Sequence, residues 1–138
     1  MMKSRMMVAA GLFLALALGL TINLSREKTS MADESKEQTL VHNVFFTLKD
    51  AENTQKLTDA CFKYLKDHPG VVYFAAGPLV KELERPVNDR DFHVALLVVF
   101  KTKKDHDTYQ TAPAHLKFIE ENKALWDKVR VFDSYSKS

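Results

Sequence analysis

The segment from Tyr109 to His115, Tyr-Gln-Thr-Ala-Pro-Ala-His, combines two side chains that can exchange protons. A phenol donates a hydrogen bond, and a neutral imidazole accepts a proton near pH 7. Pro113 lacks an amide hydrogen and its backbone suits the first turn of a helix, so one helix should end before it and another begin there. Such a bend beside a sheet favours a pocket. We therefore predict that this segment lines a small-molecule site. In the alternative in which the site also performs chemistry, His115 is the general base and Tyr109 donates to a developing oxyanion.

Structural roles for both residues stay open as alternatives. His115 would then bond to a backbone carbonyl and fix the bend, while Tyr109 would cover the core. His42 and His93 occur in predicted strands. They are candidate ligand-binding residues that also suit buried structural positions. Since histidines near the starts of two antiparallel neighbours lie toward opposite ends of a sheet, it stays open whether His93 shares a site with Tyr109 and His115.

The remaining candidate groups give no cofactor or metal site. His68 and His106 are predicted at a helix end and on the surface, with no function assigned. The histidines come from separate elements without ligand spacing or a nearby carboxylate, so we predict no metal site. CxxC, HExxH, P-loop and Gly-rich dinucleotide motifs are absent, and no cofactor is expected. The single cysteine, Cys61, sits at an apolar position of a predicted helix and is read as a core residue.

The length and the net charge of the chain limit the number of domains and the kinds of partner that it can have. A chain of 138 residues suits one domain. Its net charge of +2 is spread over interspersed acids and bases. Because nucleic-acid binding needs a concentrated basic face, we exclude nucleic acid as a partner.

The N-terminal residues differ in composition from the rest. Residues 1–24 contain Lys3 and Arg5 followed by an uncharged run rich in Ala and Leu, which indicates a signal peptide or an N-terminal membrane anchor. The protein would then be exported, periplasmic or secreted, or attached to a membrane. A translation start at Met31 is the third possibility and would leave it cytoplasmic. Residues 25–38 are polar and charged, as in a disordered linker, and residues 39–138 form the folded domain.

Hydrophobic periodicity predicts the elements of that domain. A helix with a buried stripe from Leu57 to Leu65 should follow Asp50 and end at His68-Pro69-Gly70. A second helix should follow Pro113, and a short one should lie between Thr102 and Tyr109. A charged loop should cover residues 81–91. The predicted strands are Leu40–Leu48, Val71–Val80, Phe92–Phe100 and Val129–Tyr135. This order predicts an α+β fold, a four-stranded antiparallel sheet with helices on one face.

The uncovered face of that sheet should be apolar. A soluble protein seldom leaves such a patch to water, and covering several hundred Å² is worth several kcal/mol at about 25 cal/mol per Å². We therefore predict a homodimer joined through the sheet faces. The residues assigned to this face are Val41, Phe45, Val94, Leu96, Val98 and Phe100.

Five short segments, in this order and spacing, resemble the stress-responsive alpha/beta-barrel (Dabb) domain family. They are Val41-His42-Asn43-Val44-Phe45-Phe46, His68-Pro69-Gly70-Val71, Asp91-Phe92-His93-Val94-Ala95-Leu96, Tyr109 with Pro113-Ala114-His115, and Val131-Phe132-Asp133-Ser134-Tyr135. The resemblance covers the whole predicted domain. It implies a ferredoxin-like β-α-β-β-α-β fold, a dimeric alpha/beta barrel, and a ligand cavity between sheet and helices.

The resemblance also implies two kinds of function. Most members of the family have no established activity, which fits a binding domain. One plant branch is similar to olivetolic acid cyclase, a cofactor-free enzyme acting on a polyketide, and this implies acid–base roles for Tyr109 and His115. Strand histidines matching His42 and His93 lie at or near the cavity in that pattern. The chain departs from it at Ala112, where a histidine is common, and at Ala76-Gly77, where Trp-Gly is common.

Overall fold

The computed structural model describes residues 38–137. The predicted signal or anchor, and the linker apart from Gln38, lie outside the described residues. None of the helices in residues 38–137 is long and apolar enough to span a bilayer. The strands are β1 (Leu40–Leu48), β2 (Val71–Pro78), β3 (Val94–Phe100) and β4 (Trp126–Tyr135), and the helices are α1 (Thr54–Leu65), α2 (Lys103–Gln110) and α3 (Pro113–Asn122), with short 3-10 turns η1 (Ala51–Asn53) and η2 (Lys123–Leu125).

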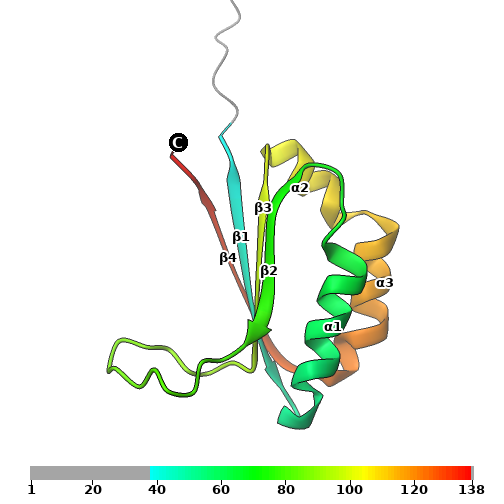
Figure 1. The fold of residues 1–138 in the computed structure, drawn as a ribbon. Coiled ribbons are helices and arrows are strands. Elements are labelled where there is room, and N and C mark those ends of the chain that lie inside the picture. The colour runs from blue at the N-terminus through cyan, green and yellow to red at the C-terminus, as the bar shows by residue number, and fades with distance from the viewer. Residues whose placement is uncertain (1–37, 138) are drawn as a thin grey trace, which may run out of the picture. The chain divides into compact units, whose positions relative to one another are not determined.

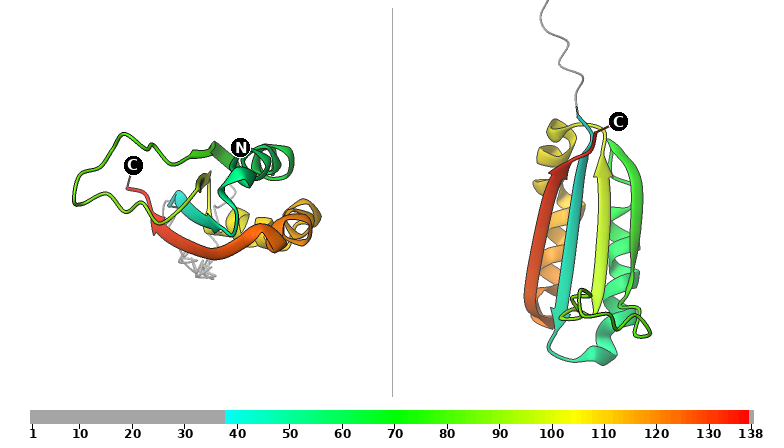
Figure 2. Two further views of the ribbon diagram at one scale, coloured as in Figure 1. Left: turned by 90° about the horizontal axis from the view of Figure 1, so that it is seen from below. Right: turned by 90° about the vertical axis from the view of Figure 1, so that its left-hand side faces the viewer.

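The four strands form one sheet in the order β2-β3-β1-β4, and every neighbouring pair is antiparallel. All three helices lie on the same face of the sheet (Figures 1 and 2). The predicted order of elements and the ferredoxin-like α+β fold are therefore confirmed. Each crossover places its helices on one side because right-handed connections on a twisted sheet pack back that way.

The helix-facing side of the sheet carries the core. Alternation along β1 buries Leu40, His42, Val44, Phe46 and Leu48, as predicted for four of these five. The stripe of α1 that faces them contains the fully buried core residues Leu57, Cys61 and Leu65. Burial raises the pKa of the Cys61 thiol to about 12, so it stays protonated.

The prediction for the face of β3 is wrong. Register places Leu96 opposite Val44, and residues directly opposite one another in an antiparallel pair share a face. Val94, Leu96, Val98 and Phe100 therefore lie beneath the helices, where they are buried. Both faces of this strand are apolar in sequence, so alternation alone could not tell them apart. The open face carries half-buried side chains: Val41, Phe45, Ala95, Leu97 and Val99.

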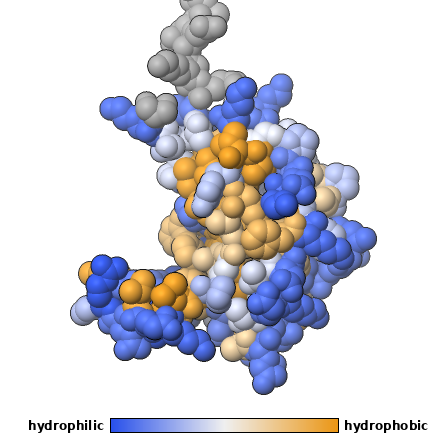
Figure 3. Space-filling model, viewed as in Figure 1, coloured by the Kyte–Doolittle hydropathy of each residue, from blue (hydrophilic) through white to orange (hydrophobic). Residues whose placement is uncertain are grey.

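The loop of residues 79–93 projects from the end of the sheet on the side away from the helices (Figure 1). Ion pairs from β4 tie its second half down, with Arg130 to Asp89 at 2.5 Å and Lys128 to Asp91 at 2.7 Å. Figure 3 shows apolar side chains gathered over β2 and on this loop. The exposed apolar residues of these two segments are Val72, Tyr73, Val80, Leu83 and Val87.

Candidate functional site

A pocket of about 420 Å³ lies between strands β1 and β4 and helices α2 and α3. It opens beside β4 because the helices leave that strand uncovered. Val131 pairs with Val44 and so points to the helix side, yet it is 48% exposed. The polar lining is His42, His106, Tyr109, Gln110, His115 and Asp133, and the apolar lining is Val44, Phe46, Leu96, Phe118, Ile119, Trp126, Val129 and Val131.

Tyr109 occupies the last turn of α2 and is almost fully buried. Its ring centroid lies 4.4 Å from that of His115 and 5.0 Å from that of Phe100. Burial, with a smaller contribution from Cys61, raises the pKa of the Tyr109 phenol well above its ordinary value. The phenol is therefore a hydrogen-bond donor at neutral pH, and its hydroxyl forms no hydrogen bond within residues 38–137.

His115 is fixed in one tautomer by the break between α2 and α3. Helix α3 begins at Pro113, as predicted, and the Nδ1 atom of His115 lies 3.0 Å from the carbonyl oxygen of Gln110. A carbonyl only accepts, so Nδ1 carries the hydrogen and the lone pair of the neutral ring is on Nε2. Burial lowers the pKa of His115 below its ordinary value, and nearby histidines add to this effect. The imidazole is therefore a neutral, oriented base that also fulfils the structural role considered for it.

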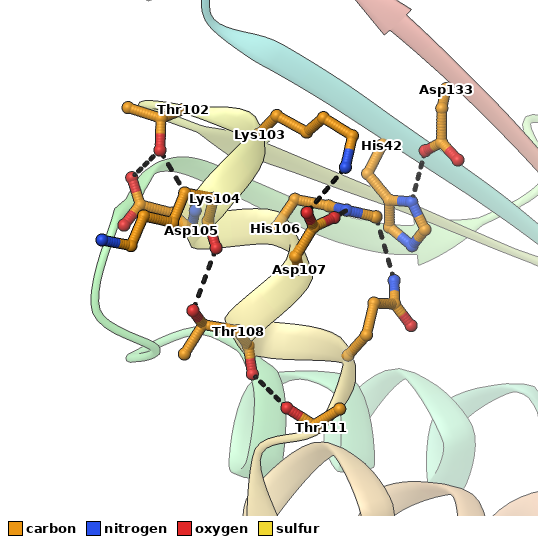
Figure 4. Close-up of polar contacts among 11 residues, drawn as sticks. His42, Thr102, Lys103, Lys104, Asp105, His106, Asp107, Thr108, Thr111 and Asp133 are labelled. Atoms are coloured by element: carbon orange, nitrogen blue, oxygen red, sulfur yellow. Dashed lines mark hydrogen bonds and ion pairs between the residues drawn. The ribbon is translucent and has the colours of Figure 1, made fainter.

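His42 lies in the same pocket, buried at the middle of the sheet. Its Nδ1 atom donates to the Asp133 carboxylate across 2.6 Å, and the register pairs the two residues directly (Figure 4). Burial lowers the pKa of His42 and outweighs the opposing effect of Asp133. His42 therefore offers a neutral ring with Nδ1 protonated.

His106 belongs to the site, although the sequence indicated only a surface position. Its side chain is 15% exposed, and its ring centroid lies 5.2 Å from that of His42. The hydrogen on Nδ1 points to Asp107 at 3.2 Å, and Nε2 accepts from the Gln110 amide at 3.0 Å. His106 lies three residues before Tyr109 and so on the same face of the predicted helix, a spacing from which its place in the site could have been predicted.

His93 does not join the others. Its Nδ1 atom accepts a hydrogen bond from the backbone N–H of Leu48 at 2.8 Å, and the ring borders a separate depression near Pro78 and Thr54. The structure therefore brings together Tyr109, His115 and His42 but separates His93, because it precedes β3 at the opposite end of an antiparallel sheet.

Asp133 also contradicts the prediction that no carboxylate lies near the histidines. A carboxylate does lie beside a histidine, because β4 pairs with β1 and places Asp133 opposite His42. His42, His106 and Asp133 each offer one metal-ligand atom, and these atoms lie within 4.8 Å of one another. Long-range strand pairing creates this group, which spacing along the chain could not show.

Several proteins of known structure are similar to this chain. No curated protein matches the chain. A Dabb family protein with a ferredoxin-like fold from Mesorhizobium loti has a TM-score of 0.61 and 21% identity, over 74% of this chain and 100% of that one. A dimeric ferredoxin-like protein of unknown function from Thermobifida fusca has a TM-score of 0.62 and 13% identity, over 73% and 93%. Hydroxynitrile lyase from Passiflora edulis has a TM-score of 0.59 and 19% identity, over 73% and 95%.

These structural likenesses establish the shared fold. The sequence pattern that defines the Stress responsive A/B Barrel Domain, Dabb, matches residues 40–136. That range runs from the first residue of β1 to just beyond the end of β4 and so includes the whole sheet, its helices and the pocket. The chain therefore belongs to the stress-responsive A/B barrel domain family.

Proposed function

We propose that the protein binds a small, mostly apolar molecule with a carbonyl or hydroxyl group in the pocket between β1, β4, α2 and α3. The observation that carries this proposal is the convergence of a buried phenol donor, Tyr109, and an oriented neutral imidazole, His115, on one largely apolar pocket. Its volume of about 420 Å³ falls within the range of small-molecule sites. Apolar walls would supply affinity, and the two polar groups would orient the ligand.

Proton transfer without a cofactor is the second candidate function, as in a lyase or a cyclase acting on an enolisable, polyketide-like molecule. The fixed tautomer of His115 favours it, because Nε2 can take a proton from a hydroxyl or an activated carbon. Tyr109 would then donate to the oxygen on which negative charge develops. One protein with this fold is named a hydroxynitrile lyase, which supports the choice of a lyase reaction.

The working unit in this proposal is a homodimer joined through the open sheet faces. Support comes from the apolar open face of β1 and β3, and from a structural neighbour described as dimeric. The loop of residues 79–93 projects on the same side and would reach around the partner copy (Figure 2). Residues 1–24 would direct export or hold the dimer at a membrane, whereas a start at Met31 would leave it in the cytoplasm.

Native mass spectrometry of the protein purified from its own cell tests the binding proposal and the N-terminal processing together. The proposal expects a dimer that retains a small molecule in the wild type. Val131→Phe, which narrows the pocket, should lose that mass, whereas Val72→Phe on the distant strand β2 should keep it. A molecule retained equally by both variants would place binding elsewhere and contradict the proposal.

A further inference from the structure

Three donor side chains from different elements meet at the solvent-facing side of the pocket. His42 of β1 and Asp133 of β4 are register partners, and His106 of α2 lies above them with its ring centroid 5.2 Å from that of His42. One ligand atom from each lies within 4.8 Å of the others. We propose that this group, the histidine–aspartate cluster, binds one divalent transition-metal ion of the Zn²⁺ type.

The donor set determines the kind of ion. Imidazole nitrogen is a good ligand for Zn²⁺, Cu²⁺, Ni²⁺ and Fe²⁺, whereas Mg²⁺ and Ca²⁺ prefer oxygen ligands. Two imidazoles and one carboxylate supply three of the four positions of a tetrahedral zinc site. The fourth would be open to the pocket, where a water molecule or a polar group of a bound ligand can occupy it.

Small side-chain movements would complete the geometry. Bond lengths of about 2.0–2.1 Å to one tetrahedral ion require ligand atoms roughly 3.3 Å apart. Nδ1 of His42 can bind the ion only when its hydrogen has moved to Nε2. The Asp133 oxygen, which lies 2.6 Å from Nδ1, must then move outward. Its side chain is 46% exposed and free to do so. His106 must move inward, and only two hydrogen bonds hold its ring, one to Asp107 and one to Gln110.

The third group distinguishes this cluster from an ordinary hydrogen bond between a buried histidine and a carboxylate. A hydrogen bond to Asp133 already satisfies Nδ1 of His42, so that pair needs no second imidazole. His106 bonds to neither of them within the described residues, yet it packs against His42 with most of its side chain buried. A metal ion bound between them would join three groups whose backbones belong to β1, α2 and β4.

Isothermal titration of untagged, metal-free, full-length protein with ZnCl₂ tests the proposal. We expect one Zn²⁺ per chain, and Co²⁺ in its place should give the visible absorption bands of a tetrahedral site. His106→Ala and Asp133→Asn should each weaken binding at least as much as loss of an outer-shell partner does, about 10- to 100-fold. The matched controls are His93→Gln and Asp127→Asn, which alter a histidine and a β4 carboxylate outside the cluster.

Each other outcome contradicts the proposal. Absence of stoichiometric binding by the folded wild type would reduce the cluster to a hydrogen-bonded pair beside a histidine. Binding that persists in both His106→Ala and Asp133→Asn would place the ion elsewhere. Circular dichroism of every variant shows that it is folded before titration. These readouts are independent of whether the pocket takes an organic ligand.

Discussion

The imidazole of His115 reaches back over the break between two helices, and its Nδ1 atom donates to the carbonyl oxygen of Gln110 across 3.0 Å. This bond leaves Nε2 as the basic nitrogen in the same pocket as the Tyr109 phenol. One contact therefore joins the last residue of α2 to the first turn of α3 and orients the candidate base.

Replacing His115 separates its structural role from its chemical one. His115→Ala removes the bond to Gln110 and should lower the free energy of unfolding by about 1 kcal/mol. His115→Gln can still donate to that carbonyl and should change stability by less, while it removes the basic nitrogen. Urea denaturation measures both changes. Equal destabilisation by the two variants would show that the bond to Gln110 does not hold the bend.

Removing the phenol oxygen of Tyr109 should leave the fold almost unchanged. The hydroxyl forms no hydrogen bond within residues 38–137, so Tyr109→Phe should alter the free energy of unfolding by less than about 1 kcal/mol. Tyr109→Ala empties a buried site and should cost about 3–5 kcal/mol. Thermal and urea unfolding compare the two. A large loss in Tyr109→Phe would mean that the hydroxyl is committed to the core and cannot serve a ligand.

Lowering the pH should reduce the free energy of unfolding of the metal-free protein over the range in which its buried histidines titrate. Burial lowers the pKa values of His42 and His115 in the folded state below the ordinary value of 6.5. As the pH falls through 6.5, these histidines bind protons in the unfolded chain before they do so in the folded protein. The stability that their neutral, buried state allows above this pH is therefore lost below it. The urea midpoint should fall between about pH 7 and pH 5, before most carboxylates titrate.

His115→Gln provides the control for this titration, because it cannot bind a proton in that range. Its urea midpoint should depend less on pH than that of the wild type. If the wild-type midpoint instead rises as the pH falls through this window, the folded histidines have raised pKa values and burial does not dominate them.

A charged residue introduced on the open face of the sheet should separate the two copies of the proposed dimer. Leu97 lies half-buried on the open face of the central strand β3, so Leu97→Glu would place a carboxylate in the sheet-to-sheet interface. Leu116→Glu makes the same change on the exposed surface of α3. Size-exclusion chromatography with light scattering should give a monomer for the first and a dimer for the second. A wild type that is monomeric at micromolar concentration would contradict the dimer.

The turn between α1 and β2 depends on Gly70. Its φ of +86° is unfavourable for other residues, and a Cβ there would overlap the Asp105 carboxyl group. Gly70→Ala should therefore cost more than about 1 kcal/mol. Gly77→Ala is the matched control, because a Cβ at Gly77 would meet nothing within 4 Å in its own chain. Similar unfolding free energies for the two variants would show that the turn adapts.

Local patterns predicted most of the fold, since alternation and helical spacing report on neighbours along the chain. They located β1, the buried stripe of α1 and the start of α3 at Pro113. They also placed Tyr109 and His115 together, because one short bend holds both. The errors concern pairings across the sheet. Only the register of β1 with β3 and β4 decides that Leu96 faces the helices and that Asp133 meets His42.

The most direct test of the candidate site is chemical-shift mapping of isotope-labelled protein with a panel of small ketones and hydroxy-aromatic compounds. We expect at least one compound to shift signals of residues that line the pocket, Tyr109 and His115 among them. Val131→Phe should abolish these shifts, and Val72→Phe should preserve them. Shifts confined to the depression beside His93 or to the open sheet face, or shifts that persist in Val131→Phe, would contradict the account.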